Sequence, residues 1–230
     1  MARISDSTLL DLWEQGACEH PLDRALGLLA QLGEGRSRSA LAALPIAERD
    51  RRLFAVAEAI FGPELALMAT CRSCSAETEL TFAVADIMAL DTPADARRVL
   101  SHGGRDHGYR MPDSRDIAQA LQAPDPHRAL LLSLLGRAEA PEDLLKALDV
   151  ALTEAAGLET LSLTFDCVEC GAGQEAPFDI LDYIWRRISA EARRLMWDIH
   201  LLARAYGWTS GEILALSPLR RAEHVAMVSA

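Results

Sequence analysis

The sequence predicts an α+β protein that is mostly helical. It is expected to contain two copies of a helix followed by a hairpin with a CxxC motif at its tip, then a long helix and a short helical end. Three observations support this prediction. Half of the 230 residues are apolar, which suffices for a hydrophobic core. Two CxxC motifs lie in similar surroundings 96 residues apart. Near the C-terminus, apolar residues recur with helical spacing.

The clearest organisational feature is this internal repeat. At an offset of 96 residues, Cys71 and Cys74 align with Cys167 and Cys170. In the ungapped stretch of 42 residues that starts at Pro45, 12 positions are identical. Units that each leave one apolar face uncovered are typical of repeat architectures. The sequence therefore predicts a duplicated structural unit.

Each element follows from the local pattern. Residues 7–32 have the apolar spacing of helices, and residues 33–39 are expected to form a loop. Each copy of the repeat starts with a helix, predicted at residues 47–61 and 141–156. Apolar residues with strand-like spacing predict a strand before each CxxC turn and a returning strand after it. These residues are Leu65, Leu67, Leu80 and Phe82 in the first copy, and Leu161, Leu163, Phe165 and Phe178 in the second.

The segment between the copies is rich in turn-forming residues. Its Gly103-Gly104 pair predicts a small exposed hairpin, and helices are expected at residues 116–121 and 129–135. The predicted organisation has five segments: an N-terminal helical segment (1–46), the first repeat (47–90), a linking segment (91–135), the second repeat (136–182) and the C-terminal helices (183–230).

The two CxxC turns predict a structural metal site. A tetrahedral Zn²⁺ bound by four thiolates needs two such turns that face each other. The expected ligands of one Zn²⁺ per chain are Cys71, Cys74, Cys167 and Cys170. Four thiolates leave no open position for water, so the predicted zinc is structural and not catalytic. Gly171 follows the second turn, where a left-handed backbone is useful.

Three alternatives for the CxxC pairs stay open at this point. They are redox dithiols, disulfides, or pairs that no longer bind metal. His102 and His107 flank the Gly103-Gly104 turn, but no third ligand is close in sequence, which favours a solvated loop. Cys18 lies outside the repeat and is expected to be a small buried apolar residue.

The C-terminal region predicts a long helix with a regular apolar stripe. Between residues 181 and 206, apolar side chains recur at alternating spacings of four and three, which is the pattern of a helix-packing seam. This seam either packs on the chain's own helices or binds a partner. A capping box at Thr209 and Glu212 and a helix start at Ser217-Pro218 follow it. The predicted partner-binding residues are Trp185, Ile188, Leu195, Ile199, Tyr206 and Trp208.

Charge and hydropathy exclude several classes. A net charge of −11 argues against general binding to nucleic acids or anionic membranes. The charge is uneven, with +3 from residue 183 onward and −14 before it, which would give polarity to a protein contact or reflect a solvated helix face. No apolar run approaches the roughly 20 residues of a membrane span. The acidic N-terminus is unlike a signal peptide, so a cytoplasmic protein is expected.

The order of motifs resembles the T-even phage baseplate hub assembly chaperone family, whose members are also encoded beside phage-like contractile injection systems. The resemblance starts with Leu12-Trp13-Glu14 and residues 20–26, and continues with Tyr109-Arg110-Met111-Pro112, Asp116 and residues 123–126. It is most specific in the last 65 residues. There it comprises the second CxxC with Gly171, residues 176–180, residues 200–208, residues 212–217 and the Arg220-Arg221 pair.

The chain departs from this family in detail. Each CxxC of the family is usually CPxCG. Here the first motif has Arg72-Ser73 between its cysteines and Ser75 after them, so it lacks both the proline and the glycine. The second motif has Val168-Glu169 between its cysteines and Gly171 after them. The family's final aromatic residue is replaced near His224.

The resemblance implies a non-enzymatic role with no catalytic residues. The expected partners are baseplate hub or spike proteins of a contractile tail-like particle. The alternative is a permanent structural subunit of that particle, and a weaker alternative is a cytosolic dithiol redox protein.

Overall fold

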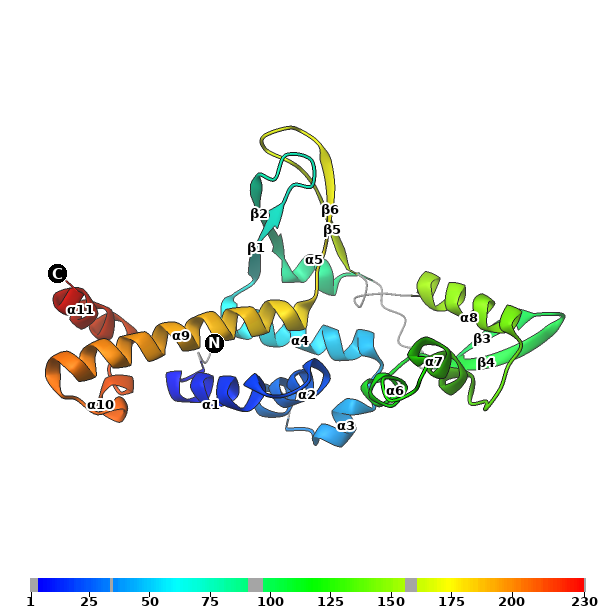
Figure 1. The fold of residues 1–230 in the computed structure, drawn as a ribbon, viewed down its shortest axis with the longest axis horizontal. Coiled ribbons are helices and arrows are strands. Elements are labelled where there is room, and N and C mark those ends of the chain that lie inside the picture. Colours follow the sequence, from blue (N-terminus) through cyan, green and yellow to red (C-terminus); the bar gives the residue numbers. More distant parts are fainter. Residues whose placement is uncertain (1–3, 34, 91–96, 156–160, 230) are drawn as a thin grey trace. The chain divides into compact units, whose positions relative to one another are not determined.

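The computed structural model describes the chain except for residues 1–3, 34, 91–96, 156–160 and 230. The described chain is mostly helical, with three separate two-stranded antiparallel sheets (Figure 1). The predicted mixture of many helices and small hairpins is therefore confirmed. The chain divides into two compact units, Pro21–Leu181 and the combination of Met1–His20 with Asp182–Ala230.

The first part of the Pro21–Leu181 unit is built around a helix that buries one face. Helix α4 places Leu53, Phe54 and Ala57 out of contact with solvent, and it packs against α2, α5 and β1. Burying three such side chains stabilises the fold by several kcal/mol, on the order of 1.5–3 kcal/mol for each large one. This part comprises α2 (Pro21–Leu32), α3 (Arg38–Ala42), α4 (Ile46–Phe61), β1 (Glu64–Thr70), β2 (Glu77–Ala83) and α5 (Val84–Met88).

Both predicted CxxC hairpins are present. Strand β1 pairs with β2, and β5 (Ser162–Asp166) pairs with β6 (Gly173–Pro177). The two hairpins stand side by side, with their CxxC ends close together (Figure 1). The duplication itself stays a prediction.

An aromatic contact joins the base of the second hairpin to the first half of the unit. Phe178 lies just after β6 and is buried, with its ring centroid 6.0 Å from that of Phe54 and 5.0 Å from that of Phe82. Its backbone N–H donates to Leu161 at 2.8 Å. The strand predicted through Phe178 therefore ends one residue earlier, because this residue turns into the core.

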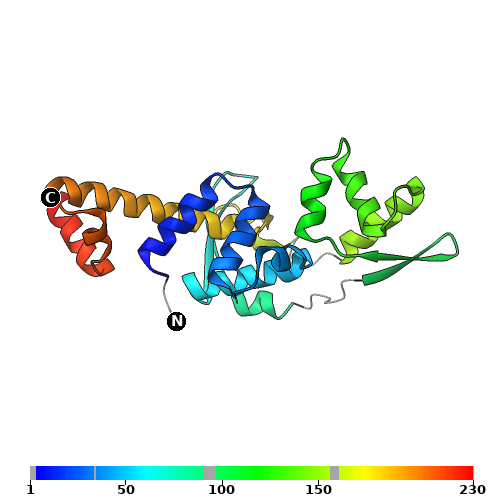
Figure 2. The same cartoon turned by 90° about the horizontal axis from the view of Figure 1, so that it is seen from below.

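A second hydrophobic cluster lies around the linking segment. The helices and the hairpin that carry it are drawn in green to yellow-green in Figure 2. Tyr109 and Leu131 are buried in it together with leucines of α7 and α8. Helix α8 packs against α7 and β3, whereas α4, its counterpart in the sequence repeat, packs against β1. The elements are β3 (Arg97–His102), β4 (Arg105–Arg110), α6 (Ser114–Ala120), α7 (Pro126–Leu135) and α8 (Glu142–Ala155).

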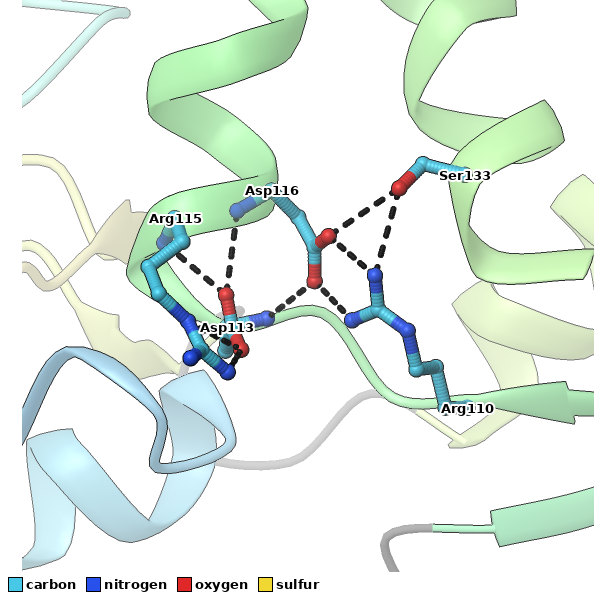
Figure 3. Close-up of polar contacts among 5 residues, drawn as sticks. All are labelled: Arg110, Asp113, Arg115, Asp116 and Ser133. Carbon is cyan, nitrogen blue, oxygen red and sulfur yellow. Dashed lines mark hydrogen bonds and ion pairs between the residues drawn. The ribbon is translucent and has the colours of Figure 1, made fainter. Parts of the chain in front are cut away.

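A polar network holds β4, α6 and α7 together (Figure 3). The guanidinium of Arg110 pairs with both carboxylate oxygens of Asp116, and the Ser133 hydroxyl donates to Asp116 at 3.1 Å. Asp113 and Asp116 form the capping box of α6, with backbone-to-carboxylate distances of 3.0 Å in each direction. Arg115 also pairs with Asp113. These acids therefore have a structural role.

The remaining unit is helical and contains a buried arginine. Arg221 is 1% exposed, and its Nη1 donates to Asp6 at 2.6 Å while its Nε lies 3.3 Å from Asp198. This ion network joins three helices, and Arg194 also pairs with Asp198. The helices are α1 (Asp6–Ala17), α9 (Ile180–Tyr206), α10 (Ser210–Leu214) and α11 (Pro218–Ser229), of which α9 begins two residues before the unit boundary.

The compact units differ from the five predicted segments. The predicted N-terminal segment is divided after His20, because Asp6 of α1 binds Arg221 of α11. The capping box at Thr209 and Glu212 and the helix start at Pro218 are present as predicted. Among the described residues, no helix has both the length and the apolar character needed to cross a membrane.

Candidate metal centre

The two CxxC turns have matching backbone geometry. In the first, the N–H of Cys71 donates to Ala76 at 2.8 Å, and the N–H of Ser75 donates to Cys71 at 2.9 Å. In the second, the N–H of Cys167 donates to Ala172 at 3.0 Å, and the N–H of Gly171 donates to Cys167 at 2.9 Å. Each hairpin thus closes on a tight turn that presents two cysteines from its tip.

Each turn ends on a residue with left-handed backbone. Gly171 has a φ of +68°, as the sequence suggested, and Ser75 has a φ of +62° at the matching place in the first turn. Among the described residues, Ser75 is the only non-glycine with positive φ. A side chain in this conformation costs roughly 1–2 kcal/mol. The first turn therefore adopts the geometry of the second without the residue that would favour it.

The four sulfur atoms form one cluster. Cys71 Sγ lies 3.7 Å from Cys170 Sγ, and Cys74 Sγ lies 3.6 Å from Cys167 Sγ. The ligand atoms of all four cysteines lie within 4.8 Å of one another, and the cysteines are free of disulfides. A metal about 2.3 Å from each thiolate in a tetrahedron would separate the sulfurs by about 3.8 Å. The cluster therefore has the dimensions of a four-thiolate metal site.

The thiols differ in burial and in acidity. Cys71 and Cys167 are buried, whereas Cys74 and Cys170 are exposed. The backbone N–H of Cys74, and with it that of Ser73, lowers the pKa of Cys71 to about 6 despite burial. Backbone N–H groups of Cys170 and Glu169 likewise lower the pKa of Cys167. These donors favour thiolates, which are the form that binds metal.

The pKa of Cys74 shifts in the other direction. The backbone N–H of Ala76 lowers it, but hydrogen bonds with the thiols of Cys170 and Cys167 raise it more, to about 12. Four thiols this close cannot all ionise without a cation among them. A bound dication would supply that charge.

One hydrogen bond between the hairpins was not expected from the sequence. The N–H of Arg72 in the first turn donates to Oε1 of Gln174 in β6 at 3.0 Å. Gln174 follows the second turn by three residues, and no motif marks it. This contact holds the two turns together independently of the cysteines.

The other candidate ligands do not gather. His102 contacts Asp143 at 3.0 Å, and His107 contacts Arg137 at 3.1 Å. Within the described part of the chain, the four cysteines are the only group of three or more His, Cys, Asp or Glu side chains placed to hold a metal. Cys18 is exposed, which corrects the expectation that it is buried; it lies at the C-terminal cap of α1.

The predicted partner-binding seam is not a free surface. Ile188 and Leu195 are completely buried within the chain, and Trp185, Ile199 and Trp208 are partly buried. Tyr206 is 40% exposed and stacks on Trp208 with ring centroids 4.6 Å apart. Ile188 and Leu195 are therefore corrected from contact residues to core residues, since a helical seam of this regularity is equally suited to internal packing.

The opposite side of α9 carries exposed large side chains. Trp197 is 60% exposed and Met196 is 47% exposed, and the Trp197 ring stacks on His200 at 5.6 Å. The apolar spacing that revealed the buried seam gave no signal for these two residues.

The comparisons with known proteins found nothing similar: no family model, no curated protein and no solved structure matches this chain.

Proposed function

We propose that the protein is a non-enzymatic assembly chaperone for the baseplate hub of a contractile phage tail or phage-like injection system, with one structural zinc. Two observations support the proposal. The order of motifs along nearly the whole chain resembles that chaperone family. The four-cysteine cluster brings together two hairpins that lie far apart in the sequence, and a metal bound there would hold them as one body.

Zinc is the metal that suits this cluster best. Four thiolates in a tetrahedron select Zn²⁺ or iron, and Zn²⁺ needs no redox chemistry. Cys71, Cys74, Cys167 and Cys170 would hold it, and a bound zinc would contribute on the order of 10 kcal/mol to folding. Because the four thiolates fill the coordination shell, this zinc does not activate water.

The redox alternative fits the geometry less well. A CxxC dithiol that cycles forms its disulfide within one motif. Here the thiols of both motifs gather in one cluster, with all four sulfurs within 4.8 Å of one another, whereas a redox dithiol needs only one motif.

The client contact is placed on one face of α9, which we call the Trp197 face. Its exposed residues Arg193, Trp197, His200 and Arg204 recur every three or four positions, and exposed Met196 lies next to Trp197. An aromatic side chain flanked by arginines is typical of protein-binding hot spots. The face is basic, and it belongs to the part of the chain that carries +3. The client surface is therefore expected to be acidic and apolar.

Metal content tests the zinc site. Elemental analysis of native protein is expected to give one zinc per chain, with none in the double variant Cys71→Ser, Cys74→Ser. Cys18→Ser is the matched control because this exposed cysteine lies outside the cluster. Iron with a visible absorption band would replace zinc in the proposal, and four titratable thiols without metal would favour the redox alternative.

Co-expression tests the chaperone role. The chain is expected to form a stoichiometric complex with a hub or spike protein of a contractile system, and Trp197→Ala should weaken it about 30-fold, as at a hot spot. Val150→Ala, which changes an apolar side chain of α8 that is 56% exposed, is the control and should bind normally. Failure to bind any such protein would refute the role. A permanent subunit would be detected by mass spectrometry in purified particles, where a chaperone is absent.

A further inference from the structure

A pocket that plays no part in the metal centre lies beside the small hairpin. It is formed between strands β3 and β4 and the C-terminal end of α7, and its volume is about 500 Å³. Tyr109, Leu134 and Leu135 give it an apolar wall that is continuous with the hydrophobic cluster beneath. Arg97, Arg98 and Arg110 also line it.

The charge of the pocket is not balanced by its own lining. Arg97 and Arg110 are directly opposite in the strand register, and like charges in such a pair repel each other. Asp116 neutralises Arg110 and raises its pKa. No ion pair joins Arg97 or Arg98 to another described residue, and no acidic residue is part of the lining. Two positive charges therefore remain.

Arg98 carries the decisive observation. Its Nε is buried, yet it has no hydrogen-bond partner in the described part of the chain. A solvated surface arginine would keep this N–H in water, whereas a buried donor without an acceptor destabilises the protein, and more so when the group is charged. Such a donor is stabilised when a ligand brings an acceptor.

The pocket lining includes a residue without a side chain. Gly108 lies opposite Val99 in the register, and a Cβ added to it would meet no atom within 4 Å. As a lining residue, Gly108 therefore presents only backbone to the pocket.

We infer that this pocket binds an oxyanion, a carboxylate or a phosphate, carried on a ligand with an apolar part. The planar fork of Arg98 matches two oxygens of such a group, with Arg97 adding charge. The apolar part of the ligand would contact Leu134, Leu135 and Tyr109.

The test follows the Arg Nε–H signals of the full-length protein by NMR at constant ionic strength. The probes are phenylacetate and phenyl phosphate, with acetate and inorganic phosphate as partners that lack the ring. A comparison of phenylacetate with phenyl phosphate shows whether the pocket prefers a carboxylate or a phosphate. Each of these two probes is expected to bind more tightly than the corresponding ion without the ring, which is acetate or inorganic phosphate. Saturable shifts are expected at Arg98.

Matched variants separate a built pocket from diffuse charge. Arg98→Gln should weaken binding about tenfold, as for loss of one charge-assisted hydrogen bond. Arg105→Gln removes the same charge near the turn of the same hairpin, outside the pocket lining, and should bind normally. Gly108→Val keeps every charge but fills the open space, and it should also weaken binding.

Two results would overturn the inference. One is a shift that never saturates with any of the four probes. The other is equal loss of binding in Arg98→Gln and Arg105→Gln, which would indicate attraction by net charge alone. If Arg98→Gln does not fold, unchanged binding by Gly108→Val overturns the inference in its place.

Discussion

Replacement of Ser75 by glycine is expected to stabilise the protein. Ser75 has a φ of +62°, a conformation that costs a non-glycine residue roughly 1–2 kcal/mol. Glycine removes that cost, but its greater conformational entropy in the unfolded chain lowers the stability by roughly 0.4–1 kcal/mol. The net gain is about 0.5–1 kcal/mol. For a chain of this size, that raises Tm by about 1–4 °C.

The second CxxC turn supplies the reverse experiment. Gly171 has a φ of +68°, and an added Cβ would meet no atom within 4 Å, so Gly171→Ser costs backbone energy without a steric clash. This variant should lose about as much stability as Ser75→Gly gains. The double exchange, with Gly at 75 and Ser at 171, should return close to the native stability, since the turns have the same hydrogen bonds.

Thermal unfolding followed by circular dichroism measures these changes. Free zinc must be held at one concentration for every variant, because a ligand that binds only the folded state raises Tm by mass action. Elemental analysis of each variant checks that the metal content is unchanged. A Ser75→Gly variant that melts below the native protein would refute the reasoning, as would a Gly171→Ser variant of native stability.

Three further predictions concern other parts of the fold. Arg221→Ala should destabilise the protein by about 3 kcal/mol in urea unfolding, because it removes a fully buried side chain, takes the partner from half-buried Asp6 and leaves buried Asp198 with Arg194 alone. Arg220→Ala, a change at the exposed neighbouring position, should stay within about 0.5 kcal/mol. Burial raises the pKa of Asp116, but Arg110, the backbone N–H of Asp113 and the Ser133 hydroxyl together lower it more, to below its usual 3.8. The contribution of Asp116 to stability is therefore present above about pH 4 and is lost as pH falls through the lowered pKa. Urea unfolding from pH 6 to pH 2 should show the native protein converging on Asp116→Asn; a constant difference would contradict this. Phe178→Ala should cost about 3–5 kcal/mol in the same assay, and a loss below about 1 kcal/mol would show that its ring contacts are not part of the core.

Local pattern was sufficient to predict much of this fold. The CxxC spacing, the glycine pair of the small hairpin and the capping residues each act within a few positions, so the sequence shows them directly. The four cysteines were predictable as a group because the repeat aligns them, and the metal ligands need that spacing. Gly171 was predictable for the same reason.

Other features depend on contacts between distant residues. The apolar stripe of α9 has the same appearance whether it faces the chain itself or a partner, so Ile188 and Leu195 were assigned to the wrong surroundings. Ser75 carries no mark of left-handed backbone, because its geometry is imposed by the turn and not by the residue. Helix α8 packs on α7 and β3, whereas its counterpart in the sequence repeat, α4, packs on β1. The sequence does not show this difference, because it depends on contacts between residues that are distant in the chain.

The wide separation of the two CxxC turns has a consequence for biosynthesis. Cys74 and Cys167 are separated by 92 residues, so the second pair leaves the ribosome about 5–20 s after the first. During that interval the first pair is half of a metal site, with two thiols and without the two other cysteine ligands. Closing the cluster therefore waits until Cys170 has been synthesised, and the nascent chain depends on a reducing environment until the second hairpin emerges.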